Sequence, residues 1–220
     1  MKVFYTNVTL NKGAYNNNPY SIHQILWELF PGVPTDGRQF LFRTTPSLDG
    51  RLHILMQSSV RPTLEVLDEL TGEVVSCSER LLPFGPDKSY QFVLYANPTT
   101  SKDGKRSPIT YSHGLNRWLA RKLEGVAIIE SVMTIVQPSF VFEKEGVRGR
   151  AHSVLFAGFL RVVNIEIFNK LIVSGIGRAK FLGMGLMTLA ETHDFAAATT
   201  NSKNQRQEMV QSLDFINTSL

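Results

Sequence analysis

Cysteine is almost missing from this chain of 220 residues, because Cys77 is its single copy. One cysteine excludes an intrachain disulfide and a cysteine-based zinc site, and it agrees with a reducing compartment. Long apolar runs are missing too: residues 126–136 are interrupted by Glu130 and are too short to span a bilayer. The first residues lack the apolar core of a signal peptide. We therefore expect a soluble, cytoplasmic protein with no membrane partner.

Closely spaced histidines are lacking as well. The five histidines are His23, His53, His113, His152 and His193. No two of them form an H-x-x-x-H pair and none adjoins the cysteine, so the sequence predicts no metal site. We also expect no cofactor.

Net charge is a modest +4, but it is unevenly distributed. Residues 1–95 hold 8 basic and 9 acidic side chains, a net of −1, whereas residues 96–190 hold 13 and 6, a net of +7. Residues 191–220 hold 2 and 4, a net of −2. A positive second half is expected of a protein that binds a polyanion. A solvated face on a mildly basic domain is the alternative.

The periodicity of apolar residues predicts an α+β fold. Strand patterns occur at residues 2–10, 39–43, 52–58, 73–78, 90–97, 126–136, 139–143, 153–163 and 185–190. Helical patterns occur at residues 19–30, 115–123 and 165–174, with a weaker one at 63–70. This order predicts two tandem ferredoxin-like (RRM-like, βαββαβ) domains with antiparallel sheets. We expect them at residues 1–84 and 85–190, followed by a polar tail at 191–220 that is disordered or forms one loose helix.

A glycine-rich loop, GIGRAKFLGMGL, occupies residues 175–186, between a predicted helix and a predicted strand. It contains Gly175, Gly177, Gly183 and Gly185, together with Arg178 and Lys180. One glycine would suffice to end the helix, so the others suggest a backbone that something large approaches closely, and the cations suggest an anion. Nucleotide-phosphate loops follow a strand and precede a helix, which is the reverse order. Nucleic acid therefore fits better than ATP or NAD, and a plain flexible turn is the alternative.

His23 differs from the other histidines in its surroundings. It lies on the first predicted helix, with Tyr20 three residues before it and Trp27 four residues after it, so the three share one side. A phenol and an imidazole on one helix side can hold a ribose-phosphate, and imidazole transfers protons near neutral pH. A packed aromatic trio is the alternative.

Basic side chains in the second half are the candidate ligands for a nucleic acid. Lys102, Lys105 and Arg106 surround Asp103-Gly104 and form a basic turn suited to an A-form groove, where shape and backbone dominate recognition. Arg117 and Arg121 share one face of the second predicted helix. The full predicted RNA-binding set is Lys102, Lys105, Arg106, Arg117, Arg121, Arg148, Arg150, Arg178 and Lys180. Solvated surface cations are the alternative for each of them.

The string IHQILWELFP at residues 22–31 resembles the H-Q-x-L-W-x-L-F-P segment of the CasE/Cse3 (Cas6e) family, the CRISPR RNA-processing endoribonucleases of type I-E systems. Further matches follow in family order over roughly residues 1–190. They are FLFR at 40–43, LMQS at 55–58, LYANP at 94–98, WLARKL at 118–123 and the glycine-rich loop. The tail beyond residue 190 has no counterpart.

The resemblance implies metal-independent cleavage of precursor CRISPR RNA at the 3′ base of each repeat stem-loop. By position, the family's catalytic histidine falls on His23 and its helper tyrosine on Tyr20. The family's RNA-engaging segment falls loosely on residues 97–122 and is shorter here. The implied partners are the repeat stem-loop, before and after cleavage, and the other Cascade subunits, notably the Cas7-type backbone. A non-catalytic scaffold that binds RNA hairpins and a subunit that docks only on proteins are the alternatives.

Overall fold

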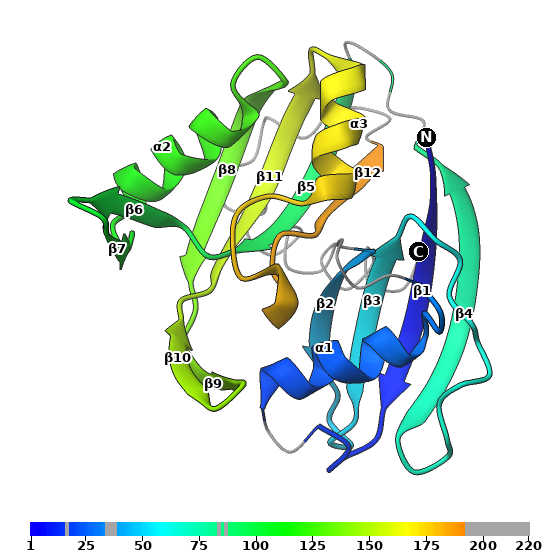
Figure 1. Ribbon diagram of the computed structural model, residues 1–220. Coiled ribbons are helices and arrows are strands. Elements are labelled where there is room, and N and C mark those ends of the chain that lie inside the picture. Colours follow the sequence, from blue (N-terminus) through cyan, green and yellow to red (C-terminus); the bar gives the residue numbers. More distant parts are fainter. Residues whose placement is uncertain (16–17, 34–38, 83–84, 86–87, 192–220) are drawn as a thin grey trace.

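The first sheet of the computed structural model comes from the first part of the chain. The structure describes residues 1–15, 18–33, 39–82, 85 and 88–191. This part contains β1 (Lys2–Leu10), α1 (Pro19–Glu28), β2 (Phe40–Pro46), β3 (Leu52–Ser58) and β4 (Gly72–Leu81). The strands lie in the order β2-β3-β1-β4, and each neighbouring pair is antiparallel. The helix α1 lies across one face of this sheet (Figure 1).

The second sheet repeats this arrangement and carries two helices. Its elements are β5 (Ser89–Ala96), α2 (Ser112–Leu123), β8 (Ala127–Val136), β11 (Val154–Val162), α3 (Ile165–Ser174) and β12 (Met187–Glu191). The strands lie in the order β12-β5-β11-β8, again antiparallel throughout. Two hairpins are inserted, β6 (Thr99–Lys102) with β7 (Lys105–Pro108) and β9 (Phe140–Lys144) with β10 (Val147–Ala151). A 3₁₀ turn, η1 (Lys180–Leu182), interrupts the glycine-rich loop.

Both sheets place their own first and third strands in the centre, between the fourth and the second. This is the strand order of the ferredoxin-like fold. The predicted α+β architecture with two tandem ferredoxin-like units and antiparallel sheets is therefore confirmed. The predicted domain limits, 1–84 and 85–190, stay a prediction. The predicted tail lies, apart from Glu191, outside the described residues.

The helix predicted at residues 63–70 is wrong, because the structure has turns and irregular chain there. The Thr63 amide donates to the Leu29 carbonyl at the end of α1 (2.8 Å), which fixes the path of the segment. Asp68 then accepts a hydrogen bond from the Thr71 amide (2.7 Å) and closes a turn into β4. Leu70 is 85% exposed, so the apolar spacing does not correspond to a buried face. Local turn chemistry prevailed over a short periodic pattern.

The helix α1 begins where its sequence predicts. Pro19 occupies the first turn, where its missing N–H is not needed, and the Asn18 side chain accepts a hydrogen bond from the Tyr20 amide (3.2 Å). Ile22 and Leu26 turn one face of α1 into the core of the first sheet. His23 lies on the flank of this buried face, beside Phe40 and Phe42 of β2, so burial of the apolar face fixes the direction in which the imidazole points.

The two sheets share buried contacts. Tyr5 and Leu41 of the first sheet belong to the same apolar cluster as Ile172 of α3. Gln57 donates to the Ile172 carbonyl (3.2 Å) and accepts from the Tyr5 hydroxyl (3.0 Å). Burial raises the pKa of Tyr5 to about 12, since the charged phenolate is disfavoured in this apolar contact between the sheets. These contacts fix the end of α3, and the loop that follows it, against β2.

Candidate active site

His23 lies in a cluster of aromatic rings where the two halves of the chain meet. The Tyr20 ring stacks on the imidazole, with centroids 5.8 Å apart and planes at 21°. Trp27 meets the imidazole edge-on at 6.2 Å, and Phe40 of β2 lies at 5.4 Å. From the second half, Phe181 of η1 lies 6.4 Å from His23. Side chains from α1, β2 and η1 therefore fix the ring.

Tyr20, His23 and Trp27 do share one side of α1, as their spacing predicts. They pack as an aromatic group, so the packing alternative describes their contacts correctly. All three nevertheless keep part of their surface open to solvent. The imidazole is thus oriented by its neighbours without being sealed in the core.

Lys144 is a site residue that the sequence analysis missed. Its ammonium lies 5.6 Å from the centroid of the Tyr20 ring and 5.5 Å from that of Phe181. Its ion pair with Glu145 is long, at 3.8 Å, and the Lys144 side chain keeps 43% of its surface exposed. A cation over an aromatic face is held electrostatically and remains able to meet an anion. The predicted strand at 139–143 ended one residue short of it.

Lys180, one of the predicted RNA ligands, belongs to η1 itself and adjoins Phe181. Arg148 and Arg150 are two further predicted ligands near this cluster. They are exposed on β10, whose partner strand β9 carries Lys144 and contacts α1. Figure 1 shows the β9–β10 hairpin extending beside α1. The hairpin thus brings three cations of the second half toward the helix that carries His23.

The other predicted cations lie elsewhere on the second half. Lys102, Lys105 and Arg106 are exposed on the β6–β7 hairpin, which projects away from α1 (Figure 1). Arg117 and Arg121 are exposed on α2, where the Arg117 guanidinium lies 2.8 Å from the His113 imidazole. The structure does not bring these side chains to His23. Their contact with RNA stays a prediction.

The glycine-rich loop has a structural explanation that differs from the expected one. A side chain at Gly175 would come within 2.6 Å of Leu41, one at Gly177 within 3.1 Å of Trp118, and one at Gly183 within 3.1 Å of Phe42. A Cβ at Gly185 would come within 2.9 Å of a backbone oxygen of the loop itself. All four glycines have a positive φ. What approaches this backbone closely is the protein itself, including β2 and α2, and a contact with RNA stays a prediction.

The two loop cations have different surroundings. Arg178 is exposed, and its backbone forms an isolated bridge with Asn97. The Lys180 ammonium donates to the Ser174 carbonyl at the end of α3 (2.5 Å), where a cation complements the helix dipole. Lys180 therefore supports the loop, whereas Arg178 is the one of the pair that faces solvent.

We expect Gly175→Ala to destabilise the protein by about 2–4 kcal/mol. Gly175 has φ 74° and ψ 158°, a region that only glycine adopts readily, and its new methyl group would meet Leu41 at 2.6 Å. Urea unfolding followed by tryptophan fluorescence measures the effect. Gly125→Ala is the matched control, because Gly125 also has a positive φ but nothing lies within 4 Å of its Cβ. Equal losses in both variants would contradict the packing role of Gly175.

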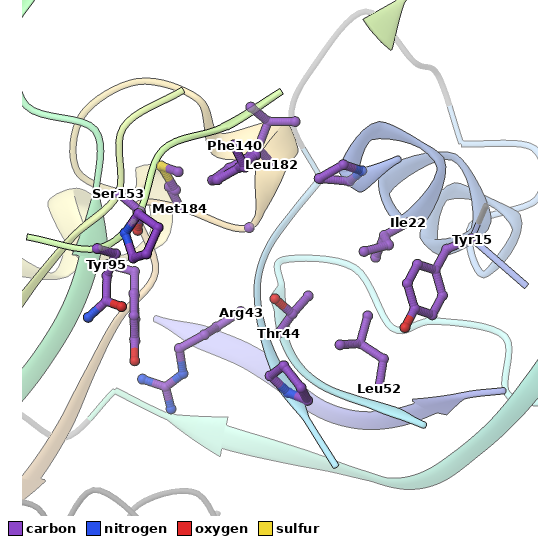
Figure 2. A pocket seen from close by; sticks show the side chains of 15 residues that line it. Tyr15, Ile22, Arg43, Thr44, Leu52, Tyr95, Phe140, Ser153, Leu182 and Met184 are labelled. Carbon is purple, nitrogen blue, oxygen red and sulfur yellow. The ribbon is translucent and has the colours of Figure 1, made fainter. Parts of the chain in front are cut away.

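A cavity of about 490 Å³ lies between the two halves. Figure 2 shows Arg43, Tyr95, Ser153 and Met184 on one side of it and Tyr15 on the other. Arg43 is 5% exposed, donates to the Thr188 hydroxyl (3.2 Å) and lies over the Tyr95 ring; burial lowers its pKa. Neither Tyr20 nor His23 lines this cavity, although their chain neighbours Pro19 and Ile22 do. The cavity and the aromatic cluster therefore adjoin the same helix on different sides.

Among the residues that the structure describes, no three His, Cys, Asp or Glu side chains are grouped so that they could hold a metal ion. In the same part of the chain, no helix has both the length and the apolar character needed to cross a bilayer.

The chain is similar to proteins of CRISPR systems. The profile of a family described as CRISPR associated protein matches residues 3–191. CRISPR system Cascade subunit CasE of Escherichia coli K12 is 30% identical over 194 residues, which cover 80% of this chain and 94% of that protein. CRISPR-associated endoribonuclease Cse3 of Thermus thermophilus is 29% identical over 191 residues, 79% of this chain and 90% of its own length. A structure of T. thermophilus Cse3 bound to an RNA representing a pre-cleavage complex has a TM-score of 0.75 at 26% identity, covering 86% of this chain and 100% of that one. The chain therefore belongs to the CRISPR-associated protein family, in its CasE/Cse3 group.

Proposed function

We propose that this protein is an endoribonuclease that cuts precursor CRISPR RNA at the 3′ base of each repeat stem-loop. The 2′-hydroxyl of the nucleotide before the cut is the nucleophile, and the reaction needs no metal ion. The relative from T. thermophilus is named an endoribonuclease and is seen with a pre-cleavage RNA, which supports this assignment.

One observation carries the proposal: the imidazole of His23 stacks on Tyr20, and the Lys144 ammonium lies over that same Tyr20 ring. A proton-transfer group, a phenol and a cation are thus gathered at one place, and they come from both halves of the chain. Cleavage of a phosphodiester by its own ribose is accelerated by proton transfer and by a cation near the developing charge, which the imidazole and the ammonium can supply.

The reaction balances as an internal transesterification. The 2′-oxygen bonds to phosphorus as its proton leaves, the bond from phosphorus to the 5′-oxygen breaks, and that oxygen gains a proton. The products are a 2′,3′-cyclic phosphate and a free 5′-hydroxyl. His23 exchanges a proton with one of these two oxygens. Such a transfer contributes roughly 10²–10⁴-fold, and in-line positioning of the bent strand contributes much of the rest.

Tyr20 and Lys144 support the transfer in different ways. The Tyr20 hydroxyl orients the ribose or the phosphate. The Lys144 ammonium offsets the charge that develops on the pentavalent phosphorane, because the cation over Tyr20 is fixed before the substrate arrives. Lys144 is thus the second-half cation of the mechanism.

After cleavage the protein keeps the stem-loop bound as a subunit of Cascade. The exposed cations of β10, Arg148 and Arg150, contact the RNA backbone beside the cut, and the β6–β7 hairpin engages more distant phosphates. The E. coli relative is named a Cascade subunit, which supports this role. Binding of this kind weakens steeply with salt because phosphate counterions are released.

A labelled repeat hairpin tests the proposal in one step. Incubation with the protein should yield two fragments, the upstream one ending in a cyclic phosphate. Hairpin binding without any cut would favour the non-catalytic scaffold instead. Absent or salt-insensitive binding would favour a subunit that docks on proteins.

We expect a chelator to leave the cleavage rate unchanged, because all the reacting groups belong to the protein and the RNA. The assay is run with and without EDTA, in monovalent salt that keeps the hairpin folded. Loss of cutting in EDTA and its return on addition of Mg²⁺ would assign the protein to another class of nuclease.

A further inference from the structure

We propose that Asn18 is a positioning residue that locks the helix carrying His23 to the β9–β10 hairpin. This inference rests on the proposed function, because it concerns how that active site is assembled. Asn18 immediately precedes α1, and its side chain bonds both to α1 and to β9. The residue therefore connects the two halves of the chain at the candidate site.

The Asn18 amide makes three hydrogen bonds. Its Oδ1 accepts from the Tyr20 amide (3.2 Å) and from the Glu143 amide (3.3 Å). Its Nδ2 donates to the Glu143 carbonyl (2.9 Å). One side chain thus caps the helix and also satisfies both main-chain groups of a residue in β9.

Capping alone does not require asparagine. Ser and Asp cap helices about as well, because the cap uses only an acceptor. The donor to Glu143 is the additional element, and of these three residues asparagine alone supplies a donor and an acceptor in one planar group. β9 and β10 form a two-stranded sheet, so the outer edge of β9 presents main-chain groups, and Asn18 pairs with those of Glu143.

The position of this clamp explains what it controls. Tyr20 lies two residues after Asn18, and Lys144 lies one residue after Glu143. The clamp therefore fixes the register between the phenol and the ammonium, which lies 5.6 Å from the centroid of the Tyr20 ring. Phe142 and Phe181 pack beside them, at 5.4 Å, but aromatic packing tolerates sliding that a bidentate amide does not. Arg148 pairs in register with Glu143 across the hairpin, so RNA bound to β10 is tied to α1 through the same residue.

The test separates capping from clamping by substitution. Asn18→Ser keeps a neutral cap and loses the donor to Glu143. Asn18→Asp keeps both acceptors and also loses the donor. Asn18→Ala loses everything. The matched control is Asn164→Ala, which removes the cap of α3, where the Asn164 side chain accepts from the Ile167 amide (3.1 Å). Single-turnover cleavage, hairpin Kd and Tm are measured for each.

We expect Asn18→Ser and Asn18→Asp to cleave about 10- to 100-fold more slowly, since small misplacements of reacting groups have effects of this size. Their Tm and hairpin Kd should stay close to those of the unaltered chain. Asn18→Ala and Asn164→Ala should each lower Tm by about 2–4 °C, but only the former should slow cleavage.

The outcomes distinguish failure of the positioning role of Asn18 from failure of the proposed endoribonuclease function. Normal cleavage by Asn18→Ser and Asn18→Asp, beside an active unaltered chain, would overturn the clamp and leave the proposed function intact. If Asn164→Ala lost as much cleavage rate as Asn18→Ala, Asn18 would act only as a helix cap. An unaltered chain that binds the hairpin but does not cut it would overturn the proposed function, and with it the clamp's catalytic purpose.

Discussion

His23→Ala stops cleavage of the repeat hairpin while leaving its binding nearly intact: this is the largest effect that we expect from a single substitution. Removal of the imidazole deletes the proton transfer, which corresponds to a loss of roughly 10²–10⁴-fold in rate. Affinity should change little, because it comes mainly from phosphate contacts made by cations on other elements. Single-turnover cleavage and hairpin titration at one salt concentration measure the two quantities.

His53→Ala is the matched control for this experiment. His53 is exposed on β3, and its Nδ1 lies 3.1 Å from the Thr9 hydroxyl, so its loss removes a histidine without touching the aromatic cluster. His23→Ala also removes ring contacts with Tyr20 and Phe40, and the Tm of each variant shows whether the fold persists. Parallel losses of cleavage and affinity in a folded His23→Ala would make His23 a structural residue.

A single deoxyribose at the nucleotide before the cut blocks the reaction in the second experiment. The attacking oxygen is then absent from the substrate, whereas the stem-loop and nearly all phosphates remain as before. We expect no product on the timescale in which the all-ribose hairpin is consumed, together with unchanged binding. A substrate with the deoxyribose one nucleotide further upstream serves as the control and should be cut normally. Persistent cutting of the first substrate would show that water, and not the ribose, attacks the phosphorus.

The repeated elements could be predicted from the sequence because each is specified locally. Apolar alternation and the Pro19 start signal define β1, β3 and α1, and the common strand order follows from arranging such elements. The helix predicted at residues 63–70 was wrong because Asp68 and the Leu29 carbonyl, one of them distant in sequence, direct the backbone there. Short periodic patterns are ambiguous wherever such contacts compete.

The two inserted hairpins differ in the strength of the local turn signal in their sequences. β6–β7 turns through Asp103 and Gly104, both at positive φ, and this dipeptide is a recognised hairpin signal. β9–β10 turns through Glu145 and Gly146, also at positive φ, and a glutamate gives no such signal. The sequence analysis predicts a turn at Asp103-Gly104, but it does not predict the strands β6, β7 and β10 or the importance of Lys144.

The sequence predicted the part of the candidate site that lies on α1, but not the part contributed by the second half of the chain. The helical spacing of Tyr20, His23 and Trp27 places them on one side of α1 and identifies the first-half contribution. The second-half contribution depends on contacts between residues far apart in sequence, such as Lys144 with Tyr20, which no local pattern encodes. The same holds for the glycine-rich loop, whose composition indicated a close approach but not that β2 and α2 make it.

The aromatic cluster has a consequence for the newly made protein. During translation, α1 and its His23 are synthesised well before Lys144 and Phe181, which complete the surroundings of the imidazole. A partly synthesised chain thus holds His23 and Tyr20 without Lys144 or Phe181 beside them. The surroundings of the imidazole are therefore complete only after β9 and η1, both late in the chain, have been synthesised.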